Sequence, residues 1–157
     1  MEIATTIEIE RPADTVFAYL ADMANNPSWQ NGQERCEWTS DPPIGEGSTY
    51  DQHARFLGKQ IVSSFEVVDF VPGEVIRITS TGGTMPIDVT RRVRPLGESR
   101  SVVEAVVKGQ PPLMMRLLGP VLRVLVARSV RADYRRLKAL LESTEPNRSA
   151  GGAGERR

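Results

Sequence analysis

The stretch "LMMRLLGPVLRVLVARSVRADYRRLKALLE", residues 113–142, decides the fold because its only turn signal is Gly119-Pro120. Apolar residues recur in it at steps of three to five, which is the spacing of an amphipathic helix. We therefore expect one long helix with a kink near Pro120. The stripe predicted to be buried consists of Leu117, Val121, Leu125, Val130, Tyr134, Leu137 and Leu141.

The same predicted helix carries seven basic residues against the two acids Asp133 and Glu142. Two interpretations stay open for this basic face. It is either a solvated surface over the buried stripe or a surface that meets an anionic membrane or a protein. Met114 and Met115, at the start of the helix, either fill the core or gate a cavity.

Strand-like segments fill most of the chain before this helix. Residues 1–10 alternate between apolar and polar side chains, which predicts a half-buried strand. From Gln33 to Gly109, turn signals such as "VPGE" separate runs rich in Val, Ile, Thr, Phe and Tyr. These runs predict antiparallel strands at roughly 34–40, 48–57, 60–70, 74–81, 86–94 and 101–108.

Two short helices are expected between the first strand and the second. In "RPADTVFAYLAD", Pro12 suits a first helical position and apolar residues recur at helical spacing, so a helix is predicted at roughly 12–21. The stretch "MANNPSWQNG", residues 23–32, is a broken turn or a second short helix. Trp29 lies inside it and is expected to turn inward, either as a plug of the core or as a ligand contact.

Together these elements predict an α+β fold. We expect a strongly curved antiparallel sheet of about six or seven strands around the long C-terminal helix, because an apolar sheet face needs a cover. The domain is expected to span residues 1–143. Residues 144–157, "TEPNRSAGGAGERR", are expected to form a disordered tail because they offer almost nothing apolar to bury.

Composition narrows the class of protein. The 157 residues suit one domain, and Lys plus Arg equals Asp plus Glu at 20 each, so no overall charge indicates nucleic-acid binding. The N-terminal residues lack the basic and apolar regions of a signal peptide, and no run is long enough to span a membrane. We therefore expect a cytoplasmic protein without stable membrane insertion, either a monomer or a homodimer.

The order and spacing of several motifs resemble the START-like, helix-grip superfamily (SRPBCC domains), in particular its bacterial polyketide cyclase/dehydrase group. The motifs are "IERPADTVFAYLAD" at 9–22, Pro27 and Trp29 after Asp22, "PPIGEGSTY" at 42–50, "FLGK" at 56–59, "FEVVDFVPGEVIRI" at 65–78 and the closing helix. The resemblance covers residues 1–142. It implies an apolar cavity between sheet and helix that binds lipids, sterols, hormones or aromatic metabolites, or that catalyses cyclisation or dehydration.

Candidate catalytic groups are few. His53 is the only histidine, and strand parity places it with Asp51 and Arg55, which favours a solvated cluster over a general base. The "GEG" at 45–47 lacks the Lys and the helix of a phosphate loop, so a turn is favoured. Cys36 is the only cysteine, and no cluster of histidines or further cysteines accompanies it as metal ligands. We assign no catalytic residue and expect no cofactor or metal.

Arg91 interrupts the face that carries Ile87, Val89 and Val93. It either holds a ligand carboxylate or lies near the sheet edge and reaches water. We expect the cavity to bind a small hydrophobic or amphipathic metabolite that is lipid-, sterol- or aromatic polyketide-like. The residues predicted to line it are Trp29, Tyr50, Gln52, Phe56, Phe65, Val67, Ile87, Val89, Arg91, Met114 and Leu118.

Two alternatives to a binding protein stay open. The first is an aromatic polyketide cyclase or dehydratase, which needs an acid or base inside the cavity and has Tyr50, Arg91 or His53 to choose from. The second is an interaction module that uses the basic C-terminal helix against a membrane or a protein.

Overall fold

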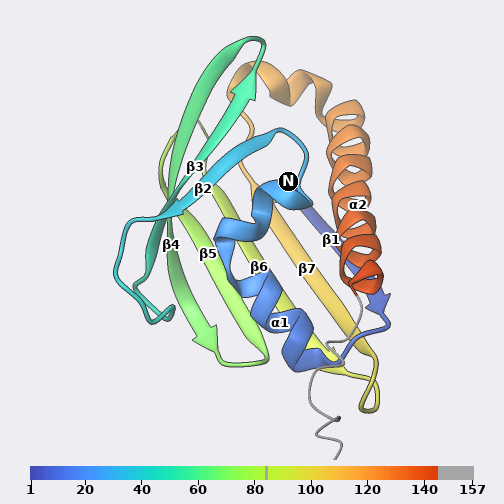
Figure 1. Ribbon diagram of the computed structural model, residues 1–157. Coiled ribbons are helices and arrows are strands. Elements are labelled where there is room, and N and C mark those ends of the chain that lie inside the picture. Colours follow the sequence, from blue (N-terminus) through green and yellow to red (C-terminus); the bar gives the residue numbers. More distant parts are fainter. Residues whose placement is uncertain (84, 145–157) are drawn as a thin grey trace, which may run out of the picture.

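The structure is a computed structural model that describes residues 1–83 and 85–144, apart from the side chain of Phe56. Within these residues, seven antiparallel strands form one sheet in the order β1-β7-β6-β5-β4-β3-β2. The sheet curls around a long C-terminal helix (Figure 1), which confirms the predicted α+β helix-grip fold. The strands are β1 Glu2–Ile9, β2 Gln33–Trp38, β3 Thr49–Phe56, β4 Lys59–Val71, β5 Val75–Gly82, β6 Ile87–Pro95 and β7 Ser101–Gly109. Apart from Thr144, the tail expected at 144–157 lies outside the described residues.

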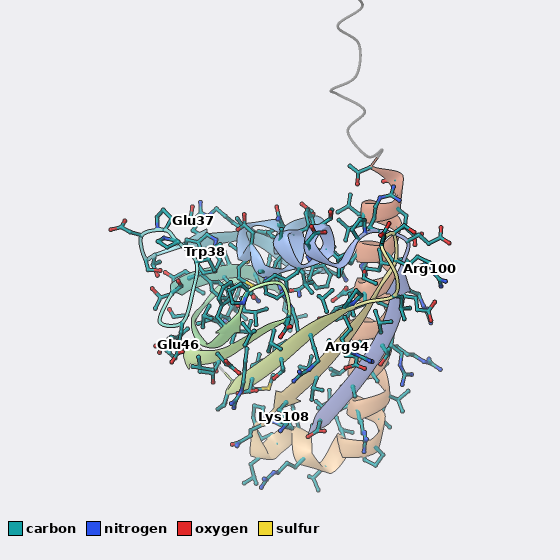
Figure 2. The ribbon with its side chains drawn as sticks, turned by 90° about the horizontal axis from the view of Figure 1, so that it is seen from below. Glu37, Trp38, Glu46, Arg94, Arg100 and Lys108 are labelled. Carbon is teal, nitrogen blue, oxygen red and sulfur yellow. The ribbon has the colours of Figure 1, made fainter. Side chains whose placement is uncertain are left out.

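Side-chain alternation gives the sheet an apolar inner face and a charged outer face. Tyr50 is opposite Phe65 in the β3–β4 register, and both are buried. The outer face carries ion pairs between neighbouring strands, namely Arg77–Asp88, Arg94–Glu104 and Lys108–Glu2. Arg94 and Lys108 are labelled in Figure 2, together with Arg100, which pairs with Glu8. These pairs join neighbouring strands across the solvent-facing side of the sheet, and the apolar inner face is left for packing.

Two short helices follow β1, as predicted. They are α1 (Ala13–Ala21) and the 3-10 helix η1 (Met23–Ser28). α1 begins after Pro12 and buries Val16, Phe17 and Leu20. The Asp22 carboxylate begins η1 by accepting a hydrogen bond from the Ala24 backbone N–H at 3.1 Å, and it also accepts one from the Trp38 indole at 2.8 Å. Asp22 thus joins the short helices to β2.

The C-terminal segment consists of the 3-10 helix η2 (Leu113–Leu118) and the helix α2 (Gly119–Ser143). Pro120 lies in the first turn of α2, where its missing N–H costs nothing, so the helix begins there instead of kinking. The second half of α2 buries Tyr134, Leu137 and Leu141 against the sheet. No helix within residues 1–83 and 85–144 is both long and apolar enough to cross a membrane.

The prediction that Leu117, Val121 and Leu125 belong to the buried stripe is wrong, because all three are largely exposed. The reason is the step of five residues between Leu125 and Val130. Five residues turn a helix by about 500°, so Val130 lies about 140° around the axis from Leu125. The predicted stripe therefore lies on the outer side of the segment at Leu117, Val121 and Leu125, and on the inner side from Val130 onward.

Candidate ligand-binding cavity

A cavity of about 160 Å³ lies between the inner face of the sheet and α2. Strands β3 to β7 form one wall, η1 and the residues after it form the end, and α2 forms the cover. The lining residues are Asn26, Gln30, Gln33, Tyr50, Gln52, Phe65, Ile78, Ile87, Val89, Arg91, Val107, Val130, Asp133 and Tyr134. The mixture of apolar walls with a few convergent polar groups is typical of small-molecule sites.

Arg91 is the charged group on the sheet side of this cavity, and only 3% of it is exposed. Its Nη1 donates hydrogen bonds to the carbonyl oxygen of Leu20 at 3.1 Å and to Asn26 Oδ1 at 3.3 Å. Its Nε has no hydrogen-bond partner among the described residues. No carboxylate of the described residues lies within ion-pair distance of its guanidinium. Arg91 is therefore a buried cation held by neutral acceptors.

Trp29 lies under Arg91 instead of lining the cavity. The guanidinium carbon of Arg91 is 5.0 Å from the centre of the indole, which is the geometry of a cation–π contact. The indole also packs edge-on against the ring of Tyr134, with 5.1 Å between ring centres. Trp29 is almost completely buried, and its Nε1 has no partner in the described part of the chain. The indole thus packs between the Arg91 guanidinium and the Tyr134 ring.

Tyr50 belongs to an aromatic group on the β3–β4 part of the sheet wall. Its ring stacks on Phe65 with 5.1 Å between centres and meets Trp38 edge-on at 5.5 Å. The buried Tyr50 hydroxyl has no hydrogen-bond partner among the residues described. Burial raises the pKa of Tyr50, although the charge of Arg91 opposes the rise. The hydroxyl therefore stays protonated and is available to a ligand as a donor.

Two further titratable groups reach the cavity from α2. Burial raises the pKa of Tyr134, and the neighbouring Arg91 opposes that rise. Burial also raises the pKa of Asp133, although the Asp133 carboxylate accepts a hydrogen bond from the Asn31 backbone N–H at 3.1 Å and pairs with Arg136 at 3.1 Å. The α2 side of the cavity thus offers a protonated phenol and a carboxylate with raised basicity.

The predicted lining residues fall into four groups in the structure. Six of them line the cavity: Tyr50, Gln52, Phe65, Ile87, Val89 and Arg91. Trp29 and Val67 are buried but do not line it. The side chain of Phe56 lies outside the described residues. Met114 and Leu118 are exposed on η2 and do not line the cavity, because they precede the five-residue step that turns the apolar face inward.

The prediction missed the polar residues that η1 and α2 contribute. Asn26, Gln30 and Asp133 lie on segments whose position depends on tertiary packing, so no local pattern indicated them. For Tyr134, the sequence did contain an indication. Tyr134 belongs to the buried helical stripe with Leu137 and Leu141, and the hydroxyl of a buried tyrosine needs a polar partner nearby.

His53 and Cys36 do not line the cavity. His53 Nε2 is 3.5 Å from Arg35 Nη2 and 4.0 Å from a Glu37 carboxylate oxygen, in a polar cluster of β2 and β3. Burial raises the pKa of Cys36 to about 11, and its Sγ donates to Gln33 Oε1 at 3.1 Å. At neutral pH the Cys36 thiol is therefore protonated and unreactive.

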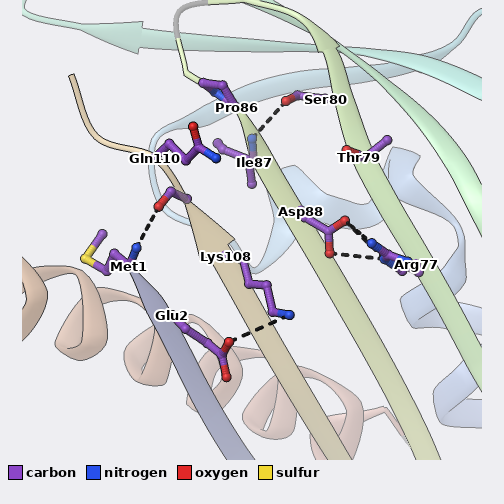
Figure 3. Close-up of a pocket in the computed structure, with 11 residues that line it drawn as sticks. Met1, Glu2, Arg77, Thr79, Ser80, Pro86, Ile87, Asp88, Lys108 and Gln110 are labelled. Atoms are coloured by element: carbon purple, nitrogen blue, oxygen red, sulfur yellow. Dashed lines mark hydrogen bonds and ion pairs between the residues drawn. The ribbon is translucent and has the colours of Figure 1, made fainter. Parts of the chain in front are cut away.

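A larger hollow of about 460 Å³ lies on the outer face of the sheet, at the same end of β5, β6 and β7 as the cavity (Figure 3). Its charged groups already have partners, since Arg77 pairs with Asp88 at 2.8 Å and Lys108 pairs with Glu2 at 3.7 Å. Ser80 Oγ accepts a hydrogen bond from the Ile87 backbone N–H at 2.8 Å. This hollow offers fewer unsatisfied groups than the smaller cavity, so we place the candidate site at Arg91.

Comparison with known proteins agrees with this geometry. A family model described as "Polyketide cyclase / dehydrase and lipid transport" matches residues 1–142. No curated protein matches the chain. A solved structure from Thermus thermophilus superposes with a TM-score of 0.75 at 18% identity, covering 92% of this chain and 100% of that one.

Two other similar structures carry descriptive names. The Zhui aromatase/cyclase from Streptomyces sp. R1128 superposes with a TM-score of 0.70 at 16% identity, covering 90% of this chain and 93% of that one. A START superfamily protein from Mycobacterium smegmatis superposes with a TM-score of 0.61 at 17% identity, covering 85% of this chain and 97% of that one. At such identities the likeness establishes the fold only.

Proposed function

This chain belongs to the polyketide cyclase, dehydrase and lipid transport family, and from that premise we propose that it binds a small amphipathic metabolite in the cavity at Arg91. The ligand has an apolar body about the size of one aromatic ring and carries one anionic group. The apolar body packs between Phe65, Ile87 and Val89, and the anionic group meets the guanidinium.

The observation that carries this proposal is the burial of Arg91 without a carboxylate partner among the described residues. A guanidinium stays charged at all ordinary pH values, and a buried charge is costly unless other groups compensate it. The Leu20 carbonyl and the Asn26 amide compensate it only in part, because both are neutral. A ligand carboxylate would supply the missing charge through charge-assisted hydrogen bonds.

The volume of the cavity limits the size of the ligand. A dry cavity of about 150 Å³ accepts a benzene ring in other proteins. The present cavity of about 160 Å³ therefore suits a one-ring acid. Sites for drug-sized ligands measure about 300–1,000 Å³, so a sterol-like or polycyclic ligand would require a wider cavity than the one observed.

Calorimetric titration with benzoate tests this proposal, with benzyl alcohol as the neutral ligand of similar size. We expect benzoate to bind and benzyl alcohol to bind at least about tenfold more weakly, since a hydrogen bond to a charged group contributes about 1.5–3 kcal/mol. Arg91→Met should abolish the preference for benzoate. Arg92→Met, next to it on β6 but exposed on the outer face, is the matched control and should keep the preference.

Equal binding of the two ligands by the wild-type protein would contradict the proposal. So would an unchanged preference in Arg91→Met. Arg91→Lys provides a check on folding, because it retains the charge and should keep part of the preference even if the methionine variant is unstable. Native mass spectrometry of protein purified from its own host would then identify the natural ligand.

A second candidate function is dehydration or cyclisation of an aromatic polyketide-like substrate. It is favoured by Asp133, whose raised pKa suits a general base, and by the protonated hydroxyls of Tyr50 and Tyr134, since all three residues line the same cavity. In a dehydration, Asp133 would take the proton next to the ketone, and a tyrosine would protonate the departing hydroxyl, which leaves as water.

The β-hydroxy ketone 4-hydroxy-4-phenylbutan-2-one is a probe for this chemistry, because loss of water gives a conjugated enone with strong ultraviolet absorbance. Catalysis predicts turnover by the wild-type protein, loss of turnover in Asp133→Asn and full turnover in the exposed control Asp69→Asn. Absence of enone formation above the buffer rate would count against this candidate and leave the binding proposal untouched.

A further inference from the structure

The segment formed by η2 and the first two turns of α2 presents an apolar surface to solvent. Leu117 is 91% exposed and Met114 is 88% exposed. The other largely exposed apolar members of this surface are Leu113, Leu118, Val121, Val124 and Leu125. We call these seven residues the outer apolar surface. Contiguous apolar exposure of this kind marks an interaction site.

The outer apolar surface is not a displaced part of the core. Val121 and Leu125 lie on the side of α2 opposite Val130 and Leu137, so no rotation brings both sets against the sheet. In Figure 1 the segment is the orange part of the ribbon at the upper end of α2, beside the sheet and not between its strands. Its occupant must therefore come from outside the domain.

The charged residues of this part of the chain are all basic. No acidic residue occurs between Glu104 and Asp133, whereas this part of the chain contains Lys108, Arg116, Arg123, Arg128 and Arg131. Arg116 and Arg123 also line a pocket of about 260 Å³ beside the surface, together with Gln110 and Leu122. Apolar side chains next to arginines that have no acidic neighbours in sequence match the interface of an anionic lipid bilayer.

We propose that the outer apolar surface docks the protein on anionic membranes. Leu113, Met114 and Leu117 enter the acyl boundary, while Arg116 and Arg123 contact lipid phosphates, one of which occupies the 260 Å³ pocket. A second copy of this chain fits less well, because a two-fold contact through the same surface would bring these arginines against one another. Docking would be reversible, since only side chains enter the bilayer.

The surface lies close to the ligand cavity. Val130 lines the cavity and follows Leu125 by five residues, a distance of about 8 Å along the helix axis. A docked protein would therefore hold the cavity near the bilayer surface. The docking inference stands on the exposed residues and their charge, so it does not require the ligand proposal to be correct.

Vesicle sedimentation tests the docking. The probes are vesicles of phosphatidylcholine alone and vesicles of phosphatidylcholine and phosphatidylglycerol in equal parts. We expect the wild-type protein to sediment with the anionic vesicles at low salt, to be released by salt, and to bind the neutral vesicles weakly. Leu117→Ser should weaken binding by about tenfold, in line with the loss of a buried leucine side chain.

A matched control is available because Leu57, at the β3–β4 turn, is exposed to a similar degree at 87%. Leu57→Ser should leave vesicle binding unchanged. The double variant Arg116→Gln, Arg123→Gln should lose more than about tenfold in affinity for anionic vesicles, and its salt dependence should be shallower. The exposed Arg92→Gln is the control for charge.

Three outcomes would overturn the docking. They are no sedimentation with anionic vesicles at low salt, equal losses in Leu117→Ser and Leu57→Ser, or a dimer in sedimentation velocity that Leu117→Ser dissociates. The last outcome would assign the surface to self-association. Benzoate titration of Leu117→Ser separates this test from the ligand proposal, because a docking defect leaves the cavity unchanged.

Discussion

Removing the hydroxyl of Tyr50 should make the empty protein more stable and its ligand binding weaker. This combination is unusual, because a buried residue that only packs would lose stability when its shape or polarity changes. It is expected here because the Tyr50 hydroxyl is buried without a partner among the described residues and faces the cavity.

The magnitude follows from the contacts. A buried hydroxyl without a hydrogen bond costs about 1–3 kcal/mol, and Tyr50→Phe removes that cost. Phenylalanine keeps the stack on Phe65 and the edge contact with Trp38, both of which involve only the ring. We expect a gain of about 1 kcal/mol in the free energy of unfolding. A gain of this size raises Tm by about 2–4 °C in a chain of this length.

Urea denaturation followed by tryptophan fluorescence measures the change, and thermal melting by circular dichroism gives Tm. Tyr19→Phe on α1 is the matched control, because Tyr19 is only half-buried and its hydroxyl should contribute little. Calorimetric titration of the same variants with benzoate measures the effect of each substitution on ligand affinity. Loss of one neutral hydrogen bond to the ligand should weaken binding by about two- to tenfold.

A lower Tm in Tyr50→Phe would refute the reasoning, because it would mean that the hydroxyl already has a partner in the empty protein. A higher Tm with unchanged benzoate affinity would place the ligand elsewhere in the cavity. Only the two effects together support Tyr50 as a ligand contact.

Three further predictions concern other parts of the molecule. Because burial raises the pKa of Cys36 to about 11, iodoacetamide should alkylate the folded protein far more slowly than the urea-unfolded protein at neutral pH, as mass spectrometry can measure. Trp29→Ala should cost about 3–5 kcal/mol of unfolding free energy in urea, more than the same change at the less buried Trp38. Glu142 accepts a hydrogen bond from the Glu10 backbone N–H at 3.0 Å, which lowers its pKa, so its stabilisation is present at neutral pH and is lost as pH falls through that lowered pKa. Thermal melts of Glu142→Gln should therefore differ from wild type at neutral pH and converge with it in acid.

Alternation along the strands carries most of the information about the sheet. It places Arg91 on the same face as Val93, and both are buried in the structure. The sequence does not indicate what surrounds Arg91, because the Leu20 carbonyl and the Asn26 amide belong to α1 and η1, 65 to 71 residues earlier. Such partners depend on how the short helices pack on the sheet, and no local pattern encodes that packing.

Helical spacing of apolar residues predicts less about the C-terminal helix. A stripe defined by steps of three to five residues can move from one face of the helix to the other without being noticed. Steps of three, four and five residues all suit a loosely defined stripe, although a step of five turns the helix much further than a step of four. The five-residue step after Leu125 is the point at which the apolar stripe passes from the outer to the inner side. Placing Met114 and Leu118 in the cavity failed for the same reason, since both precede this step.

This change of face links the cavity to the outer apolar surface. In the first half of α2 the inward residues are Leu122, Val126 and Ala127, and all three are only half-buried. The strand residues at this end of the inner face, Ile87, Val89 and Val107, are also half-buried and line the cavity. The helix therefore closes the core tightly only in its second half. A stripe that stayed inward through Leu117, Val121 and Leu125 would direct those side chains towards this space. The sequence instead leaves a cavity beside Arg91 and turns Leu117, Val121 and Leu125 outward, so one feature of α2 accounts for both the space that can hold a ligand and the surface that can meet a membrane.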